Sequence, residues 1–321
     1  MAQTSESRPV SIPLPAAGFV TGEPPRRRFV LVALSVLAGF LLTVVWSAEF
    51  VDRTIGDNVA DSLLGHSAKE TPIGGIMSGL AFAIASGVAG TFTACNVAVF
   101  GALTPMMGQR STARSRMRQT LKPLGWLSVG MLSISAVYGF VVGLVGTHMP
   151  QFQTAQSSAT LSPRSIQSMV VFGIIGLALI WFGLAAAGVV PDPLAGIAAR
   201  FPNAPMVLMG ALIGGFLIGR PFALFRQMFR EAAESHNPLY GAAAFCLQSI
   251  GNIVILSVLF LLTAVLGGPR LQSWLSAKPG RAAALVACAF LIAGVFTFLY
   301  WDVRLLARRD LIWYPIAPWA A

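Results

Sequence analysis

The residue with the clearest chemical potential is Cys95, which lies in the middle of a long apolar segment, residues 84–107. Thr93 and Asn96 flank it closely, and Pro105 follows near the end of the segment. A cysteine at a helix N-terminus is a better nucleophile, because the positive end of the helix dipole stabilises the thiolate. The pattern therefore predicts a reactive thiol. The alternative is a small packing residue, because free cysteine is among the most buried residue types.

Glycine and proline interrupt this segment, which reads IASGVAGTFTACNVAVFGALTPMM. A polar group without a partner in hydrocarbon costs several kcal/mol. A broken backbone is tolerated in a membrane only where protein or a water-lined cavity satisfies the freed groups. We therefore predict an interrupted membrane helix that presents Cys95 inside a helical bundle, with Thr93, Asn96 and Pro105 at the break or in the cavity beside it.

A second segment of the same kind, MGALIGGFLIGRPFALFRQMF at 209–229, is broken at Arg220-Pro221. An offset of 127 residues (214 − 87) places Gly87 on Gly214. Two broken segments at matching places in two halves of a chain point to an inverted repeat with its site at the interface. Arg220 is itself a functional-site hypothesis, because ionisable groups in a span mark sites unless they reach the headgroups.

Gln248 and Asn252 lie inside another apolar segment and share one helical face at i, i+4 spacing. Polar side chains in a span usually face the bundle and hydrogen-bond to neighbouring helices. They could also line a cavity beside Cys95. After the second break, Arg226 and Arg230 alternate with apolar residues and predict an amphipathic surface segment, with a partner-docking face as the functional alternative.

Other chemistry has little support in the sequence. The three histidines lie in separate loops without the close spacing of a zinc site, so we predict no metal site and no cofactor. There is no glycine-rich phosphate loop and no nucleophile elbow. Whether the chain is an enzyme stays open.

The elements that must position these residues are membrane helices. Of 321 residues, 55% are hydrophobic and 11% charged, whereas a soluble domain has about 25% charged residues. The mean hydropathy is +0.73. Seven apolar segments are long enough to span a bilayer, at 29–46, 75–106, 124–146, 168–190, 206–225, 239–266 and 282–301. We predict an all-α polytopic bundle of about seven spans: a three-plus-three inverted repeat with broken helices plus an extra N-terminal helix.

Charge indicates orientation and partners. The 22 Lys and Arg residues outnumber the 12 Asp and Glu residues and cluster in short loops beside apolar segments. This distribution favours contact with anionic membrane lipids and argues against nucleic acid. We predict a multi-pass protein of the cell (inner or cytoplasmic) membrane. Its parts would be a disordered cytoplasmic N-terminus (1–25), an extra helix with an outer loop (26–74), the main bundle (75–301) and an amphipathic tail (302–321).

Two stretches together resemble a known family. GVAGTFTACNVAVFGALTP at 87–105 and AAESHNPLYGAAAFCLQSIGNIVIL at 232–256 are similar to the cytochrome c biogenesis transmembrane family of the CcdA/DsbD type. The resemblance covers about residues 75–301. It implies a three-plus-three bundle that passes reducing equivalents between a thioredoxin-like protein and thiol proteins on the outer face, or that supports cytochrome c assembly.

The chain departs from that family at the residues that matter most. The prolines around the first redox cysteine are absent, and Phe222 stands where the second cysteine is expected. Thiol exchange needs a second thiol to resolve a mixed disulfide, so Cys95 alone cannot complete the cycle. Three hypotheses follow: divergent thiol-disulfide transfer, small-solute transport or export on the same scaffold, and a non-catalytic membrane subunit of a partner complex.

Overall fold

The computed structural model describes residues 23–47, 57–67, 73–90, 113–153, 161–219, 223–262, 273–275 and 277–320. Every regular element in these ranges is helical. The prediction of an all-α protein is therefore confirmed. Residues 1–22, most of the predicted disordered N-terminus, lie outside the described ranges.

Five of the described helices are long and apolar enough to cross a membrane, and a sixth span is counted if one bent pair of helices is included. The five spans contain α1 (Arg28–Val45), α5 (Ala113–Val145), α6 (Pro163–Ala186), α10 (Pro238–Leu262) and α12 (Arg281–Phe298). The bent pair is α8 (Ala204–Gly219) with α9 (Ala223–Glu234), inclined at 82°. The chain is therefore a multi-pass membrane protein.

Shorter elements complete the bundle. The apolar helix α3 (Ile76–Ala89) belongs to the predicted second span, whose remainder from residue 91 lies outside the described ranges. The others are α2 (Asn58–Leu64), η4 (Gly146–His148), η5 (Pro150–Phe152), α7 (Ala195–Arg200), η7 (Leu299–Val303), α13 (Arg304–Ala307) and η8 (Pro318–Ala320).

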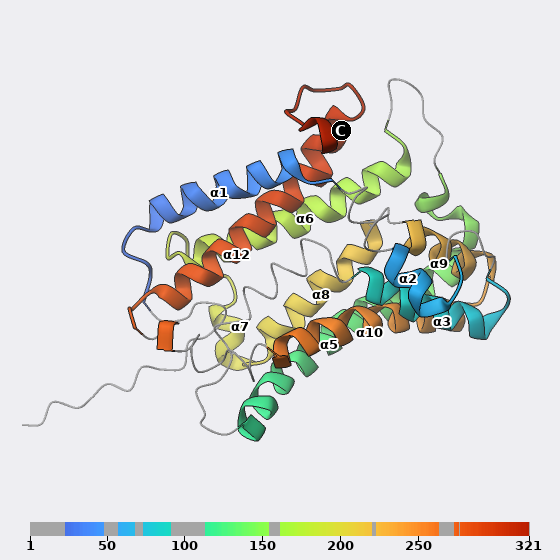
Figure 1. Ribbon diagram of the computed structural model, residues 1–321, viewed down its shortest axis with the longest axis horizontal. Helices are drawn as coiled ribbons and strands as arrows, with labels where there is room; N and C mark the ends of the chain where they lie inside the picture. Colours follow the sequence, from blue (N-terminus) through green and yellow to red (C-terminus); the bar gives the residue numbers. More distant parts are fainter. Residues whose placement is uncertain are drawn as a thin grey trace, which may run out of the picture.

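The long helices form two packed groups (Figure 1). In one group, α12 lies between α1 and α6. Glycines on α6 and α12 allow the two backbones to approach closely. A Cβ on Gly176 would lie 2.9 Å from the Phe298 nitrogen, and a Cβ on Gly294 would lie 2.6 Å from the Ile180 nitrogen. In the other, α5 packs against α10 and α8, and α10 also packs against α3. The pairs α5–α10 and α6–α12 are antiparallel, because contact positions rise along one helix as they fall along the other.

The α3–α10 crossing is a close backbone contact built on two glycines. A Cβ on Gly87 would overlap the carbonyl oxygen of Gln248, and a Cβ on Gly251 would overlap the carbonyl oxygen of Ile84. Small residues at such crossings let helix backbones approach each other in membranes, where packing rather than water exclusion drives association.

The α5–α8 crossing repeats this arrangement. A Cβ on Gly210 would overlap the carbonyl oxygen of Leu127, and a Cβ on Gly130 would overlap that of Val207. In this pattern α3 is equivalent to α8, and α10 is equivalent to α5, as expected for two inverted halves. The register differs from the prediction: the contacts place Gly87 on Gly210, an offset of 123 residues (210 − 87) instead of 127. Sequence alignment missed this by about one helical turn, because glycine recurs at 210 and 214.

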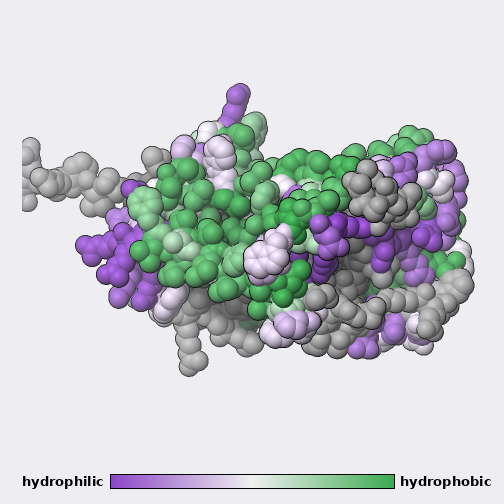
Figure 2. Space-filling view, turned by 90° about the horizontal axis from the view of Figure 1, so that it is seen from above, coloured by the Kyte–Doolittle hydropathy of each residue, from purple (hydrophilic) through white to green (hydrophobic). Residues whose placement is uncertain are grey.

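The two ends of the bundle are marked by polar contacts. At one end, the Arg28 guanidinium donates to the carbonyl oxygen of Gly188, 2.9 Å away, joining the start of α1 to the end of α6. At the other end, α12 continues through η7 and α13 to Ala307, beyond the predicted boundary at 301. Hydrophilic residues gather toward both ends of the face in Figure 2, and apolar side chains form a broad area between them.

The residues after α13 fold back onto the end of α1. The Ala317 backbone nitrogen donates to the Val44 carbonyl oxygen at 3.0 Å, and Trp319 Nε1 donates to the Val45 carbonyl oxygen at 3.2 Å. Within the predicted amphipathic tail (302–321), Ala317 and Trp319 thus cap the end of α1, whose last carbonyl groups have no partners within the helix.

Candidate functional site between the two repeats

Six of the eight predicted site residues lie outside the part of the chain that the structure describes. Those outside the described ranges are Thr93, Cys95, Asn96, Pro105, Arg220 and Pro221. The helices before them are described: α3 ends at Ala89, and α8 ends at Gly219. The described part of each segment therefore ends before the predicted chemical residues.

Gln248 and Asn252, the two remaining predicted residues, lie at the α3–α10 crossing. Gln248 is 0% exposed and Asn252 is 7% exposed. Among the described residues, neither Oε1 nor Nε2 of Gln248 has a hydrogen-bond partner. On the facing helix, Ser86 is 1% exposed, and its Oγ also has no partner. Gln248 is near the middle of the 25-residue α10, so Gln248 and Ser86 lie deep in the bundle.

A second polar pair lies next to the first, toward α5. The Ser135 and Ser249 hydroxyl oxygens are 2.6 Å apart, and the Ser135 hydroxyl also lies 2.9 Å from the Met131 carbonyl oxygen. These hydroxyls satisfy one another, in contrast to Gln248 and Ser86. Ser249 follows Gln248 directly, so adjacent positions of α10 carry one satisfied and one unsatisfied polar group. We call Ser86, Ser135, Gln248, Ser249 and Asn252 the central polar cluster.

Side chains also hold the broken end of α8, and sequence reasoning missed them. Gln151 and Gln167 each donate from Nε2 to the Ile218 carbonyl oxygen, at 2.7 and 2.9 Å. The Ser168 hydroxyl donates to the Gly219 carbonyl oxygen at 2.7 Å. The last carbonyls of a helix have no intrahelical partners, so these bonds stabilise the break. The available signal was the presence of glutamine and serine at the edge of an otherwise apolar span.

The two described cysteines, Cys246 and Cys288, each take part in one hydrogen bond with a neighbouring helix. Cys246 Sγ donates to the Leu132 carbonyl oxygen at 3.8 Å. The Ser35 hydroxyl donates to Cys288 Sγ at 3.3 Å, joining α1 to α12. Both thiols are free and partly buried, as expected of packing residues.

Helix α9 has the predicted amphipathic character. It exposes Arg226 and Arg230 and buries Leu224, Phe225, Met228, Phe229, Ala232 and Ala233. The buried side packs into the same apolar cluster as Tyr138 and Phe245. The apolar side thus anchors α9 against the bundle while the arginines face outward.

Asp302 is a second group that the sequence analysis did not select, because it lies one position beyond the predicted last span. The π-helical turn η7 carries it against α6, where a Cβ on Gly173 would lie 3.2 Å from Asp302 Oδ1. Its Oδ2 is buried and has no hydrogen-bond partner among the described residues. A π-helical turn inside a long helix often marks a functional position.

Within the described ranges, no group of three or more His, Cys, Asp or Glu side chains could hold a metal ion. Comparisons with known proteins found no matching family model, no matching curated protein and no matching solved structure.

Proposed function

We propose that this protein moves a small polar solute across a cell membrane and binds it at the interface between the two inverted repeats. The observation that carries the proposal is the buried Gln248 side chain, whose amide has no protein partner among the described residues. Leaving a buried donor or acceptor unpaired costs about 1–3 kcal/mol. A ligand that pairs with the amide would remove that cost.

The surrounding architecture supports the same proposal. Inverted-repeat transporters bind their solutes near the bilayer midplane, beside discontinuous helices. Here α8 stops at Gly219 and α9 leaves at 82°, with side chains holding the freed carbonyls. The reciprocal glycine contacts give each half a matching crossing at which the two halves meet. Rocking of one repeat against the other could therefore open the central polar cluster to either side.

Flux measurements in proteoliposomes test this proposal. We expect the purified protein to conduct at least one small uncharged polar solute, and Gln248→Leu to reduce its flux about tenfold, since each 1.4 kcal/mol of lost interaction is a factor of ten. The matched control is Leu247→Met, one position along the same helix and apolar in both forms. Wild-type vesicles that conduct no more than empty ones would contradict the proposal.

Thiol-disulfide transfer is the second candidate, and it depends on Cys95 and the family resemblance described above. It predicts that Cys95→Ser abolishes function, whereas solute transport predicts that flux survives this change. Labelling of Cys95 in intact cells under reducing and oxidising conditions separates the two. Labelling that switches with redox state, together with a trappable mixed disulfide with a thioredoxin-like or cytochrome c assembly protein, would favour thiol transfer.

A further inference from the structure

The two glycine crossings have the same backbone geometry but opposite side-chain chemistry. Gly87 on α3 occupies the position that Gly210 occupies on α8, and Gly251 on α10 occupies the position that Gly130 occupies on α5. One position before Gly210 is Met209, and three before Gly130 is Leu127. The same steps from Gly87 and Gly251 lead to Ser86 and Gln248.

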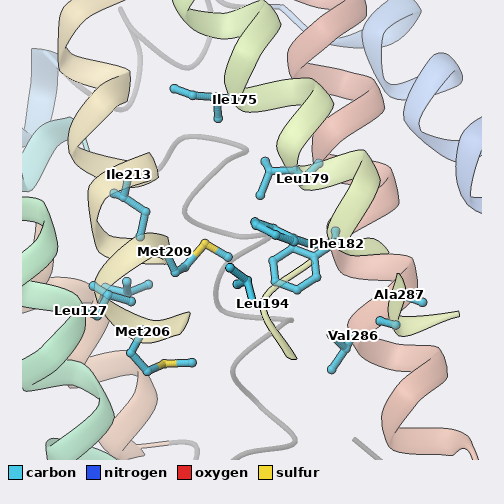
Figure 3. Packing of buried hydrophobic residues seen from close by; sticks show 14 of the residues in the cluster. Leu127, Ile175, Leu179, Phe182, Leu194, Met206, Met209, Ile213, Val286 and Ala287 are labelled. Carbon is cyan, nitrogen blue, oxygen red and sulfur yellow. The ribbon is translucent and has the colours of Figure 1, made fainter. Parts of the chain in front are cut away.

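The α5–α8 crossing is apolar and closed. Leu127 and Met209 are both wholly buried and belong to one hydrophobic cluster. Figure 3 shows Leu127 beside Met206 and Met209, with the side chains pointing toward the centre of that cluster. These residues pack without leaving any polar atom to be satisfied.

The α3–α10 crossing replaces that apolar pair with two buried polar groups. The Gln248 amide offers one acceptor oxygen and two donor hydrogens, and the Ser86 hydroxyl can donate and accept. None of these atoms has a hydrogen-bond partner among the described residues. Because the backbone crossing is equivalent in both halves, the fold itself does not require polar residues at these two positions.

The chemistry of the crossing also specifies the ligand. Neither α3 nor α10 contains Asp, Glu, Lys or Arg. A charged ligand there would be an uncompensated charge in a low-dielectric interior, which is very unfavourable. A neutral ligand that both donates and accepts hydrogen bonds fits the available groups.

We infer that Ser86 and Gln248 form a repeat-specific binding site for a small neutral solute that both donates and accepts hydrogen bonds, such as an amide or an alcohol. Passage of this solute across the membrane rests on the proposed transport function, whereas its binding at Ser86 and Gln248 does not. Gln248 is wholly buried, so the described conformation is closed, and the solute enters when the repeats separate.

The test copies the chemistry of one crossing onto the other. The variant Ser86→Met/Gln248→Leu gives α3–α10 the side chains of α5–α8, and Ser86→Ala/Gln248→Leu serves where methionine overpacks. The matched control is Met209→Leu in the apolar crossing. Thermal unfolding of the purified proteins is measured alone and with acetamide, glycerol, acetate or ammonium.

We expect acetamide or glycerol to raise the Tm of the wild type and the control, acetate and ammonium to leave it unchanged, and both double variants to lose the shift. The alanine-containing double variant should be at least as stable as the wild type without ligand, because unpartnered polar groups have been removed. A marked fall in its Tm would mean that these groups are paired within the protein and would overturn the site. Unaltered ligand shifts in both double variants, or shifts with the ions alone, would overturn it as well.

Flux separates this inference from the proposed function. Ligand shifts that the double variants abolish, in a protein that conducts no solute, would leave the binding site standing and remove transport. Solute flux that persists in the double variants would leave transport standing and remove Ser86 and Gln248 as its site.

Discussion

The Arg304 guanidinium donates to the carbonyl oxygen of Thr43 at 2.6 Å, joining the start of α13 to the end of α1. The same side chain, which is wholly buried, also donates to the carbonyl oxygens of Trp46 and Ala320. Its guanidinium lies 4.9 Å from the centre of the Tyr300 ring. A cation at a helix C-terminus interacts favourably with the helix dipole. Arg304 therefore ties α1, α12 and the C-terminal residues together.

Replacing Arg304 by methionine should destabilise this end of the bundle. Hydrogen bonds to charged groups contribute about 1.5–3 kcal/mol each, and the variant leaves three carbonyl groups without their donor. We expect a clear fall in Tm and faster proteolysis of the C-terminal residues that follow α13. The matched control is Arg308→Met, because Arg308 is exposed on the neighbouring turn. Equal Tm values for the two variants would show that the buried contacts of Arg304 contribute little.

Adding a side chain at Gly87 should separate α3 from α10. A Cβ there would overlap the Gln248 carbonyl oxygen, which is backbone and cannot rotate away. Overpacking of this kind costs about 1–3 kcal/mol, so we expect Gly87→Val to lower Tm and to expose Gln248 to solvent.

The control for this change is Gly125→Ala on α5, where a Cβ would meet no atom within 4 Å. Alanine is favoured over glycine in helices by about 1 kcal/mol, so this variant should be neutral or slightly stabilised. If Gly87→Val behaves like Gly125→Ala, the α3–α10 crossing is not a close backbone contact.

The Ser135–Ser249 hydrogen bond should couple α5 to α10. Both groups are wholly buried and 2.6 Å apart. A double-mutant cycle with Ser135→Ala and Ser249→Ala should give a coupling energy of about 1 kcal/mol in unfolding. The comparison is Ser133→Ala, which removes an exposed hydroxyl that donates to the Val129 carbonyl oxygen of the same helix. Additive single and double changes would contradict the coupling.

Removing the glutamine donors should loosen the broken end of α8. In Gln151→Leu/Gln167→Leu the Ile218 carbonyl oxygen loses both donors that bind it. We expect hydrogen exchange to rise at the end of α8 and the start of α9, with the rest of the bundle unchanged. Ile166→Leu, at an exposed position beside Gln167, is the control. Exchange that stays the same in the glutamine variant would mean that the break does not depend on these side chains.

The amino-acid sequence determined the class of this protein, because hydrophobicity and segment length are properties of the chain alone. Spans of about 20 apolar residues, few charges and glycine-proline interruptions predict a helical membrane bundle without any knowledge of packing. The same local signals located the break after Gly219, the amphipathic helix α9 and the buried pair Gln248 and Asn252.

Tertiary structure decided which residues face each other. The alignment of the two halves depends on which glycines meet a neighbouring backbone. From the sequence, either Gly210 or Gly214 could be the position equivalent to Gly87. The contact of Arg304 with Thr43 spans 261 residues, so no local pattern predicts it. Nor could the sequence distinguish Ser249, which has a partner on α5, from Gln248, which has none among the described residues. A side chain's need for a partner is encoded locally, but whether that partner is present depends on the packing of helices that are distant in the chain.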